Sequence, residues 1–89
     1  MFEWDRAKSA KNLRERGFDF AYAARIFAGP TLEADDPRRC QGEHRIRAIG
    51  RVDDHILFVV YTWRDAVRRI ISARLANRKE RNAYRAIYG

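Results

Sequence analysis

The stretch ILFVVYTW, residues 56–63, decides the fold that this sequence predicts. It is aliphatic, β-branched or aromatic on both faces of an extended chain, which is typical of a strand in the middle of a sheet. Before it, Glu43–Val52 alternates apolar and polar residues and ends at the turn residues Asp53-Asp54. After it, the chain turns at 64–66 and Val67–Arg74 forms another strand-like run. Three neighbouring antiparallel strands are therefore expected.

The N-terminal third reads as one short strand followed by two helices. Phe2–Trp4 alternates and predicts an edge strand. Asp5 is a suitable N-cap for a helix to Arg16, and Gly17 is a suitable stop. The apolar stripe expected on this helix is Ala7, Ala10 and Leu13. A second helix begins after Asp19, carries the stripe Phe20, Ala23, Ala24 and Phe27, and ends at Gly29-Pro30.

The remaining segments complete an α+β domain. Residues 31–34 predict a first strand of the meander, and 35–39 predict a polar loop. Asn77 is expected to cap a last helix that runs to about Ile87, with Glu80 as its capping-box partner. The 89 residues leave room for a single domain, 1–89. Its predicted fold is two N-terminal helices and a C-terminal helix packed against an antiparallel sheet.

The composition predicts a protein of the reduced cytoplasm. The sequence has no apolar run of about 18 residues, the length needed to span a membrane. Its N-terminus is charged throughout and lacks a secretory apolar region. The lone Cys40 cannot form an internal disulfide. A cytoplasmic location without membrane association is therefore expected.

Positive charge gives the first indication of function. Lys and Arg number 19 against 12 Asp and Glu, and 16 of the 19 are Arg. Residues 1–60 carry a net charge of +1, whereas 61–89 carry +6. Arginine binds phosphate or carboxylate through two parallel hydrogen bonds and stacks on bases. This charge predicts a surface for nucleic acid or an acidic protein, although a codon-driven preference for arginine on a merely soluble surface would give the same composition.

The side chains available favour cleavage of RNA without a metal or other cofactor. The sequence has no glycine-rich phosphate loop and no paired Cys or His spacing for a metal. Attack of a ribose 2′-OH on its own phosphodiester needs a base, cations and a proton donor. The residues that the sequence offers for catalysis are Arg64, Arg69, Arg74, Glu43, Glu80 and Tyr84, with Trp63, Arg78 and Arg81 as RNA-binding residues.

Purely structural roles are also open for these residues. Glu80 is a helix-capping residue, and Arg81 is placed for surface ion pairs. Regular strand alternation puts Arg68, Ile70, Ser72 and Arg74 on one face, and Arg69, Ile71 and Ala73 on the other. On that pattern Arg69 and Arg74 do not face the same ligand. The sequence leaves open which face packs on the helices.

Several short motifs, taken together and in order, resemble the BrnT family of bacterial type II toxins. They are Phe2-x-Trp4-Asp5-x-x-Lys8, Asn12, Gly17, Phe20, Phe27, Gly42-Glu43-x-Arg45, Ile49-Gly50, Val60-Tyr61-Thr62, Arg69-Ile70-Ile71-Ser72-Ala73-Arg74, Glu80-Arg81 and Tyr84. The resemblance implies a compact fold similar to RelE-type toxins. It also implies a ribosome-independent RNA endonuclease that inhibits translation and growth, and it adds Lys8 to the RNA-binding candidates.

The same resemblance implies a protein partner. Members of the family are neutralised by a BrnA antitoxin, which dimerises through a ribbon-helix-helix part and carries the complex to operator DNA. Two positions depart from the family pattern. Glu15-Arg16-Gly17 stands where Lys-His-Gly is usual, and Thr62-Trp63-Arg64 stands where Thr-Glu-Arg is frequent.

Two other functions fit the same residues. A non-catalytic nucleic-acid-binding or regulatory module would use the basic surface, and its binding would weaken steeply with salt without yielding a product. A protein-interaction domain would pair its arginines with an acidic partner and would have no affinity for RNA when alone.

Overall fold

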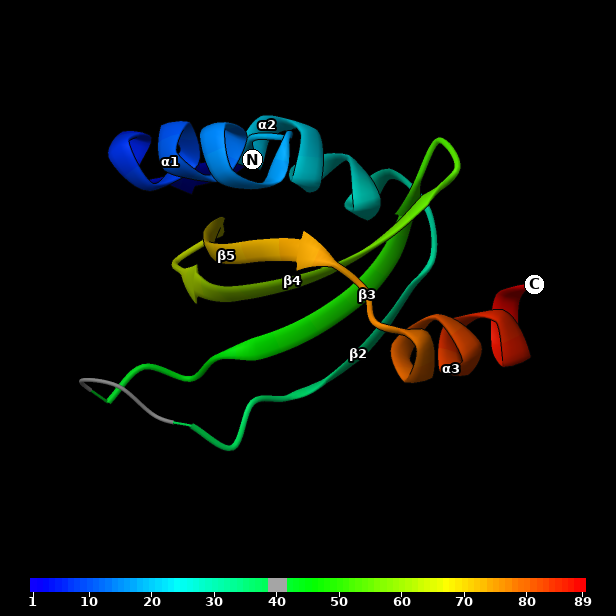
Figure 1. Ribbon diagram of the computed structural model, residues 1–89. Helices are drawn as coiled ribbons and strands as arrows, with labels where there is room; N and C mark the ends of the chain where they lie inside the picture. Colours follow the sequence, from blue (N-terminus) through cyan, green and yellow to red (C-terminus); the bar gives the residue numbers. More distant parts are fainter. Residues whose placement is uncertain (39–41) are drawn as a thin grey trace.

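The computed structural model describes residues 1–38 and 42–89 of the chain (Figure 1). Five strands form one sheet in the order β1-β5-β4-β3-β2. Their bounds are Phe2–Trp4 for β1, Thr31–Asp35 for β2, Ile46–Val52 for β3, His55–Arg64 for β4 and Val67–Leu75 for β5. The segment 56–63 lies in β4, the central strand, as its sequence predicts. Cys40 and the last residue of the expected polar loop lie outside the described residues.

The expectation of an all-antiparallel sheet is wrong at one edge. Strands β2 to β5 form the predicted antiparallel meander. Strand β1 instead pairs with β5 in parallel, with Glu3 opposite Arg69. These two strands are far apart in sequence, so no hairpin forces them to run in opposite directions. The sheet is therefore mixed.

Three helical regions flank the sheet. They are α1 (Arg6–Arg16), α2 (Phe20–Ala23) with the 3-10 turn η1 (Ala24–Ala28), and α3 (Arg78–Tyr88). The second predicted helix is thus a single α-helical turn continued by η1. Helices α1 and α2 lie above one face, and α3 lies at one end of the sheet on the other side (Figure 1). None of the helices in the described chain has the length and apolar character needed to cross a bilayer.

The predicted helix ends are confirmed. The Asp5 carboxylate accepts a hydrogen bond from the Lys8 amide at 3.0 Å, and Gly17 ends α1 in the left-handed region at φ 86°. Asn77 and Glu80 form a complete capping box at the start of α3. These contacts satisfy backbone groups that a helix terminus leaves unpaired, which is why local sequence predicts them.

The predicted apolar stripe of α1 is wrong. Leu13 is 50% exposed, and the residues that α1 buries are Ser9 and Asn12. The Ser9 hydroxyl accepts a hydrogen bond from the Phe20 amide at 3.0 Å. The Asn12 side-chain amide donates to the Phe18 carbonyl at 2.9 Å. Helix α1 therefore packs on the following segment through two buried polar side chains, which form hydrogen bonds with the backbone of Phe18 and Phe20.

The main core lies between the sheet and the α1–α2–η1 layer. Alternate β4 residues, Leu57, Val59 and Tyr61, are buried there with Phe20 and Ile26. A smaller cluster under α3, around Tyr84 and Ile56, lies on the opposite face. The part of that face which α3 leaves uncovered is called the open face below.

A β-bulge in β5 determines which side chains reach the open face. Val60 is opposite Ser72, but the next β4 residue, Tyr61, is opposite Ile70, so Ile71 is an extra residue in the ladder. A bulge of this kind resets the alternation of side chains. Arg69 and Arg74 therefore share the open face, whereas Arg68 points to the other face. The expected separation of Arg69 from Arg74 is wrong for this reason.

Candidate functional site

A pocket of about 490 Å³ opens on the open face, and we call it the central pocket. Strands β3, β4 and β5 form its floor, while α3, the end of α1 and residues 36–38 form its walls. Its charged lining residues are Arg16, Arg38, Arg47, Arg74, Asp36 and Glu80. Four cations thus face two carboxylates, so the pocket carries a net positive charge and suits an anionic ligand.

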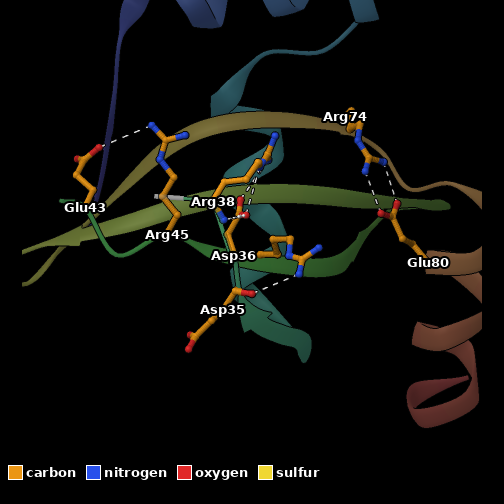
Figure 2. A network of polar contacts seen from close by, with 8 residues as sticks. Asp35, Asp36, Arg38, Glu43, Arg45, Arg74 and Glu80 are labelled. Carbon is orange, nitrogen blue, oxygen red and sulfur yellow. Dashed lines mark hydrogen bonds and ion pairs between the residues drawn. The ribbon is translucent and has the colours of Figure 1, made fainter. Parts of the chain in front are cut away.

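Arg74 and Glu80 form the best-defined ion pair of the central pocket. The two guanidinium Nη atoms of Arg74 donate to the two carboxylate oxygens of Glu80 at 2.8 and 2.9 Å, as Figure 2 shows. The Arg74 guanidinium also lies 4.1 Å from the centre of the Phe58 ring. Hydrogen bonds from Arg74 hold the pKa of Glu80 below its ordinary value, although partial burial opposes this shift. Glu80 is therefore a carboxylate at neutral pH.

A second ion pair lies across the pocket. The carboxylate of Asp36 is buried and accepts hydrogen bonds from the Arg38 amide and guanidinium at 3.0 to 3.3 Å. These hydrogen bonds lower the pKa of Asp36, so it too remains ionised. Asp36 holds Arg38 at the rim, where the side chain of Arg38 is 76% exposed.

Arg47 lines the same pocket and forms no ion pair with a carboxylate of the described residues. Its Nη2 donates to the Asp35 carbonyl at a long 3.4 Å, and its buried Nε has no hydrogen-bond partner among the described residues. Its positive charge helps to lower the pKa of both Asp36 and Glu80. A cation with unused donors facing a pocket is well placed to bind an incoming oxyanion.

A separate cluster occupies the other end of the open face. Arg69 donates to Glu3 at 3.0 Å, and Arg64 contacts Glu43 at 3.3 Å. Glu43 is also 3.8 Å from Arg45 (Figure 2). The predicted residues Arg64, Arg69 and Glu43 are therefore brought together, but none of them lines the central pocket.

The other sequence-predicted residues are dispersed. The hydroxyl of buried Tyr84 donates to the Pro30 carbonyl at 2.9 Å, a contact that anchors α3. Arg81 donates to the Ala76 carbonyl at 2.8 Å. Arg78 is exposed on α3, and Lys8 is exposed on α1. Trp63 lies on the helix-covered side of the sheet, 47% exposed, against Arg68.

Sequence reasoning missed four residues of the open face as candidates, namely Arg16, Arg38, Arg45 and Arg47. Arg45 and Arg47 alternate with apolar residues, so the sequence could have placed both on one face of the strand. The meeting of Arg47 with Arg74 in the central pocket depends on strand pairing, because Val60 of β4 is opposite both Arg47 of β3 and Ser72 of β5. No periodic pattern in the sequence predicts that Arg16 or Arg38 lines the pocket.

A comparison with known families matches most of the chain. The family described as "Ribonuclease toxin, BrnT, of type II toxin-antitoxin system" matches residues 4–80. The chain belongs to the BrnT family. BrnT proteins are ribonuclease toxins that are paired with a protein antitoxin and act on RNA. No curated protein matches the chain closely enough to count as a relative.

The fold separates the two positions at which the resemblance led us to expect other residues. Arg16, where a histidine was expected, lines the central pocket beside Ser72 and Arg74. Trp63, where a glutamate was expected, lies on the opposite face of the sheet in contact with Arg68 and Tyr61. Of the two, only Arg16 belongs to the central pocket.

Proposed function

We propose that this BrnT protein is a ribosome-independent, metal-independent endoribonuclease that cleaves single-stranded RNA in the central pocket. The observation that carries the proposal is the position of Arg47 and Arg74 in one open, net-positive pocket. Both guanidinium groups face the space that a phosphodiester would occupy. A phosphate bound there would receive charge-assisted hydrogen bonds from two sides, which strengthen as negative charge builds in the transition state.

Binding of the phosphate involves an exchange of partners at Arg74. In the free protein its two donors are occupied by Glu80, at 2.8 and 2.9 Å. A phosphate of the RNA takes these donors in place of the carboxylate. Glu80 then loses the contact that lowers its pKa and becomes a better base within the same pocket.

The reaction that follows is an internal transesterification. Glu80 removes the proton of the ribose 2′-OH, and the 2′ oxygen forms a bond to phosphorus while the bond from phosphorus to the 5′ oxygen breaks. The 5′ oxygen takes up a proton from solvent, and Glu80 returns its own proton to solvent, so the proton count balances. The products are a 2′,3′-cyclic phosphate and a 5′-hydroxyl. DNA has no 2′-OH and is not a substrate.

The proposed function includes neutralisation of the toxin by an antitoxin. A BrnA-like antitoxin, dimerising through a ribbon-helix-helix part, would neutralise the toxin by covering the open face with acidic and apolar residues. This charge match would speed association and make it sensitive to salt. Operator DNA would be bound only through the antitoxin in the complex.

The decisive experiment is cleavage of a single-stranded RNA by the purified, antitoxin-free protein in EDTA. Wild type, Arg74→Ala and Arg47→Ala are compared, with Arg85→Ala as a matched control that removes one exposed arginine from α3 outside the pocket. Arg47→Ala is informative because it breaks no ion pair among the described residues. Thermal unfolding of each variant checks that the fold is retained.

We expect cyclic-phosphate products from wild type and Arg85→Ala, and a loss of about 100-fold or more in rate for each pocket variant. Cleavage that disappears in EDTA and returns with a divalent metal would contradict the metal-independent mechanism. Salt-sensitive binding of RNA without any product would favour the second candidate, a non-catalytic RNA-binding module. The arginine in the pocket at position 16, where the family usually has histidine, is the observation that favours this second candidate.

A further inference from the structure

A second pocket lies beside the central one, between α1 and the outer edge of β5. Its volume is about 190 Å³, and we call it the α1–β5 pocket. The charged residues that line it are Lys8, Lys11 and Arg16 against the single carboxylate of Glu15. None of these four side chains takes part in an ion pair with another described residue. The pocket is thus also net positive.

The two pockets share a boundary. Arg16, Ser72 and Ala73 line both of them. Ser72 is exposed, and its hydroxyl is free of side-chain hydrogen bonds within the described chain. A ligand that occupies both pockets must therefore pass over Ser72, within reach of a free hydroxyl and of the Arg16 guanidinium.

The strand arrangement keeps this passage open. Strand β1 pairs only with residues 68–70 of β5, so no strand of the described chain covers the outer edge of β5 from Ile71 onward. The bulge at Ile71 lies at the same point. Side chains of Ile71 and Phe20 give the α1–β5 pocket an apolar floor beneath its lysines.

We propose that single-stranded RNA crosses the outer edge of β5 at Ser72, with one phosphate in the central pocket and a neighbouring phosphate in the α1–β5 pocket. The inference rests on the proposed function and adds the path of the substrate. Lys8 and Lys11 supply charge to the second phosphate, and Arg16 lies between the two. The Ser72 hydroxyl contacts the ribose-phosphate linkage as it crosses the strand.

The experiment measures RNA binding separately from cleavage. The double variant Lys8→Ala, Lys11→Ala is compared with Arg6→Ala, Arg14→Ala, which removes the same charge from exposed positions of the same helix outside both pockets. Each pair is made in the Glu80→Gln background to prevent turnover. The affinity for a short unstructured RNA is measured by fluorescence anisotropy as a function of salt.

Each lost phosphate contact should reduce the slope of log affinity against log salt by about 0.7. The two lysines contact one phosphate, so the lysine pair should lose about 0.7, which at about 0.1 M salt corresponds to roughly five-fold weaker binding. For a dinucleoside monophosphate, which has a single phosphate, the same variant should bind like wild type. The arginine control should show a smaller change in slope with both ligands.

Ser72→Glu provides a second test at the boundary, because a carboxylate there repels both phosphates. It should weaken RNA binding at least as much as the lysine pair, whereas Ser72→Ala should keep the fold and lose only a few-fold in affinity.

Equal salt slopes for the lysine pair and the arginine control would overturn the proposed path while wild-type cleavage still stood. A wild type that neither binds nor cleaves RNA would overturn the proposed function itself.

Discussion

Arg69 and Arg74 lie on the same face of the sheet although their positions differ by five, an odd number, which in a regular strand would place them on opposite faces. The extra residue Ile71 changes the alternation of β5, so Arg69 is opposite Thr62 and Arg74 is opposite Phe58, both on the open face. Arg68 faces the other way, 4.0 Å from the centre of the Phe27 ring. The bulge therefore decides which arginines of β5 reach the open face.

Substitution of the neighbouring arginines should separate binding from stability. Arg69→Ala should reduce the salt dependence of RNA binding by about 0.7 in slope, since one cation leaves the open face. Arg68→Ala should leave that slope unchanged and lower the free energy of unfolding by about 1 kcal/mol, because its stacking on aromatic rings is lost. Anisotropy titrations and urea unfolding measure the two effects. The reverse pattern would mean that the bulge does not reset the face of β5.

The Arg74–Glu80 pair should make stability depend on pH in a defined direction. The pKa of Glu80 is lowered in the folded protein from an ordinary value of 4.5. The unfolded chain therefore binds the proton more tightly, and the stabilisation is complete well above that value and lost as pH falls through the folded pKa. Glu80→Gln keeps an oxygen for the capping box but removes the charge.

The free energy of unfolding is to be measured by urea titration for wild type and Glu80→Gln. Wild type should be more stable at about pH 7, and the difference should shrink as the pH falls below 4.5. Glu15 is an exposed carboxylate without an ion pair in the described chain, so the control Glu15→Gln should show little pH-dependent difference. A gap of constant size for Glu80→Gln would show that the charge of Glu80 does not stabilise the fold.

Gly50 should tolerate no side chain. A Cβ at this position of β3 would lie 2.6 Å from Ile26 Cβ and 3.1 Å from Thr31 Cγ2, so η1 would have to move away from the sheet. Gly50→Ala should cost about 1–3 kcal/mol of stability. Gly29→Ala, where no atom lies within 4 Å, should be nearly neutral. Chemical unfolding of the two variants makes the comparison, and equal stabilities would contradict the close packing of η1 on β3.

The polar residues of α1 should matter more than its leucine. Asn12→Ala leaves the buried Phe18 carbonyl without its donor at 2.9 Å and should cost about 1–3 kcal/mol. Leu13→Ala removes a side chain that is half exposed, and its effect should stay within about 0.5 kcal/mol. Thermal unfolding of both variants tests the order of the two effects. A larger loss for Leu13→Ala would restore the apolar stripe that the sequence suggests.

Reversal of the two departures from the BrnT pattern should have unequal effects. Arg16→His puts an imidazole, which can transfer protons near neutral pH, into the central pocket and should raise the rate of RNA cleavage. Trp63→Glu changes the opposite face and should leave that rate within a few-fold of wild type. Single-turnover cleavage assays compare the two variants. An increase with Trp63→Glu alone would place the reaction outside the central pocket.

Local sequence determined most of the secondary structure of this protein. Asp5, Gly17 and the Asn77–Glu80 pair define helix ends because their side chains or backbone freedom act on groups only a few residues away. The apolar segment of β4 required a central strand because both of its faces had to be buried. The concentration of arginine likewise indicated an anionic ligand before any residue was placed in space.

Only the tertiary structure decided which residues form the pocket. The bulge at Ile71 is a property of pairing between β4 and β5, so alternation within β5 alone gave the wrong face for Arg69. Burial of Asn12 is favourable because another segment supplies the Phe18 carbonyl, which no periodicity in α1 can reveal. Arg16, Arg47 and Arg74 meet because three distant elements pack together, and such long-range contacts are not encoded in the spacing of any one of them.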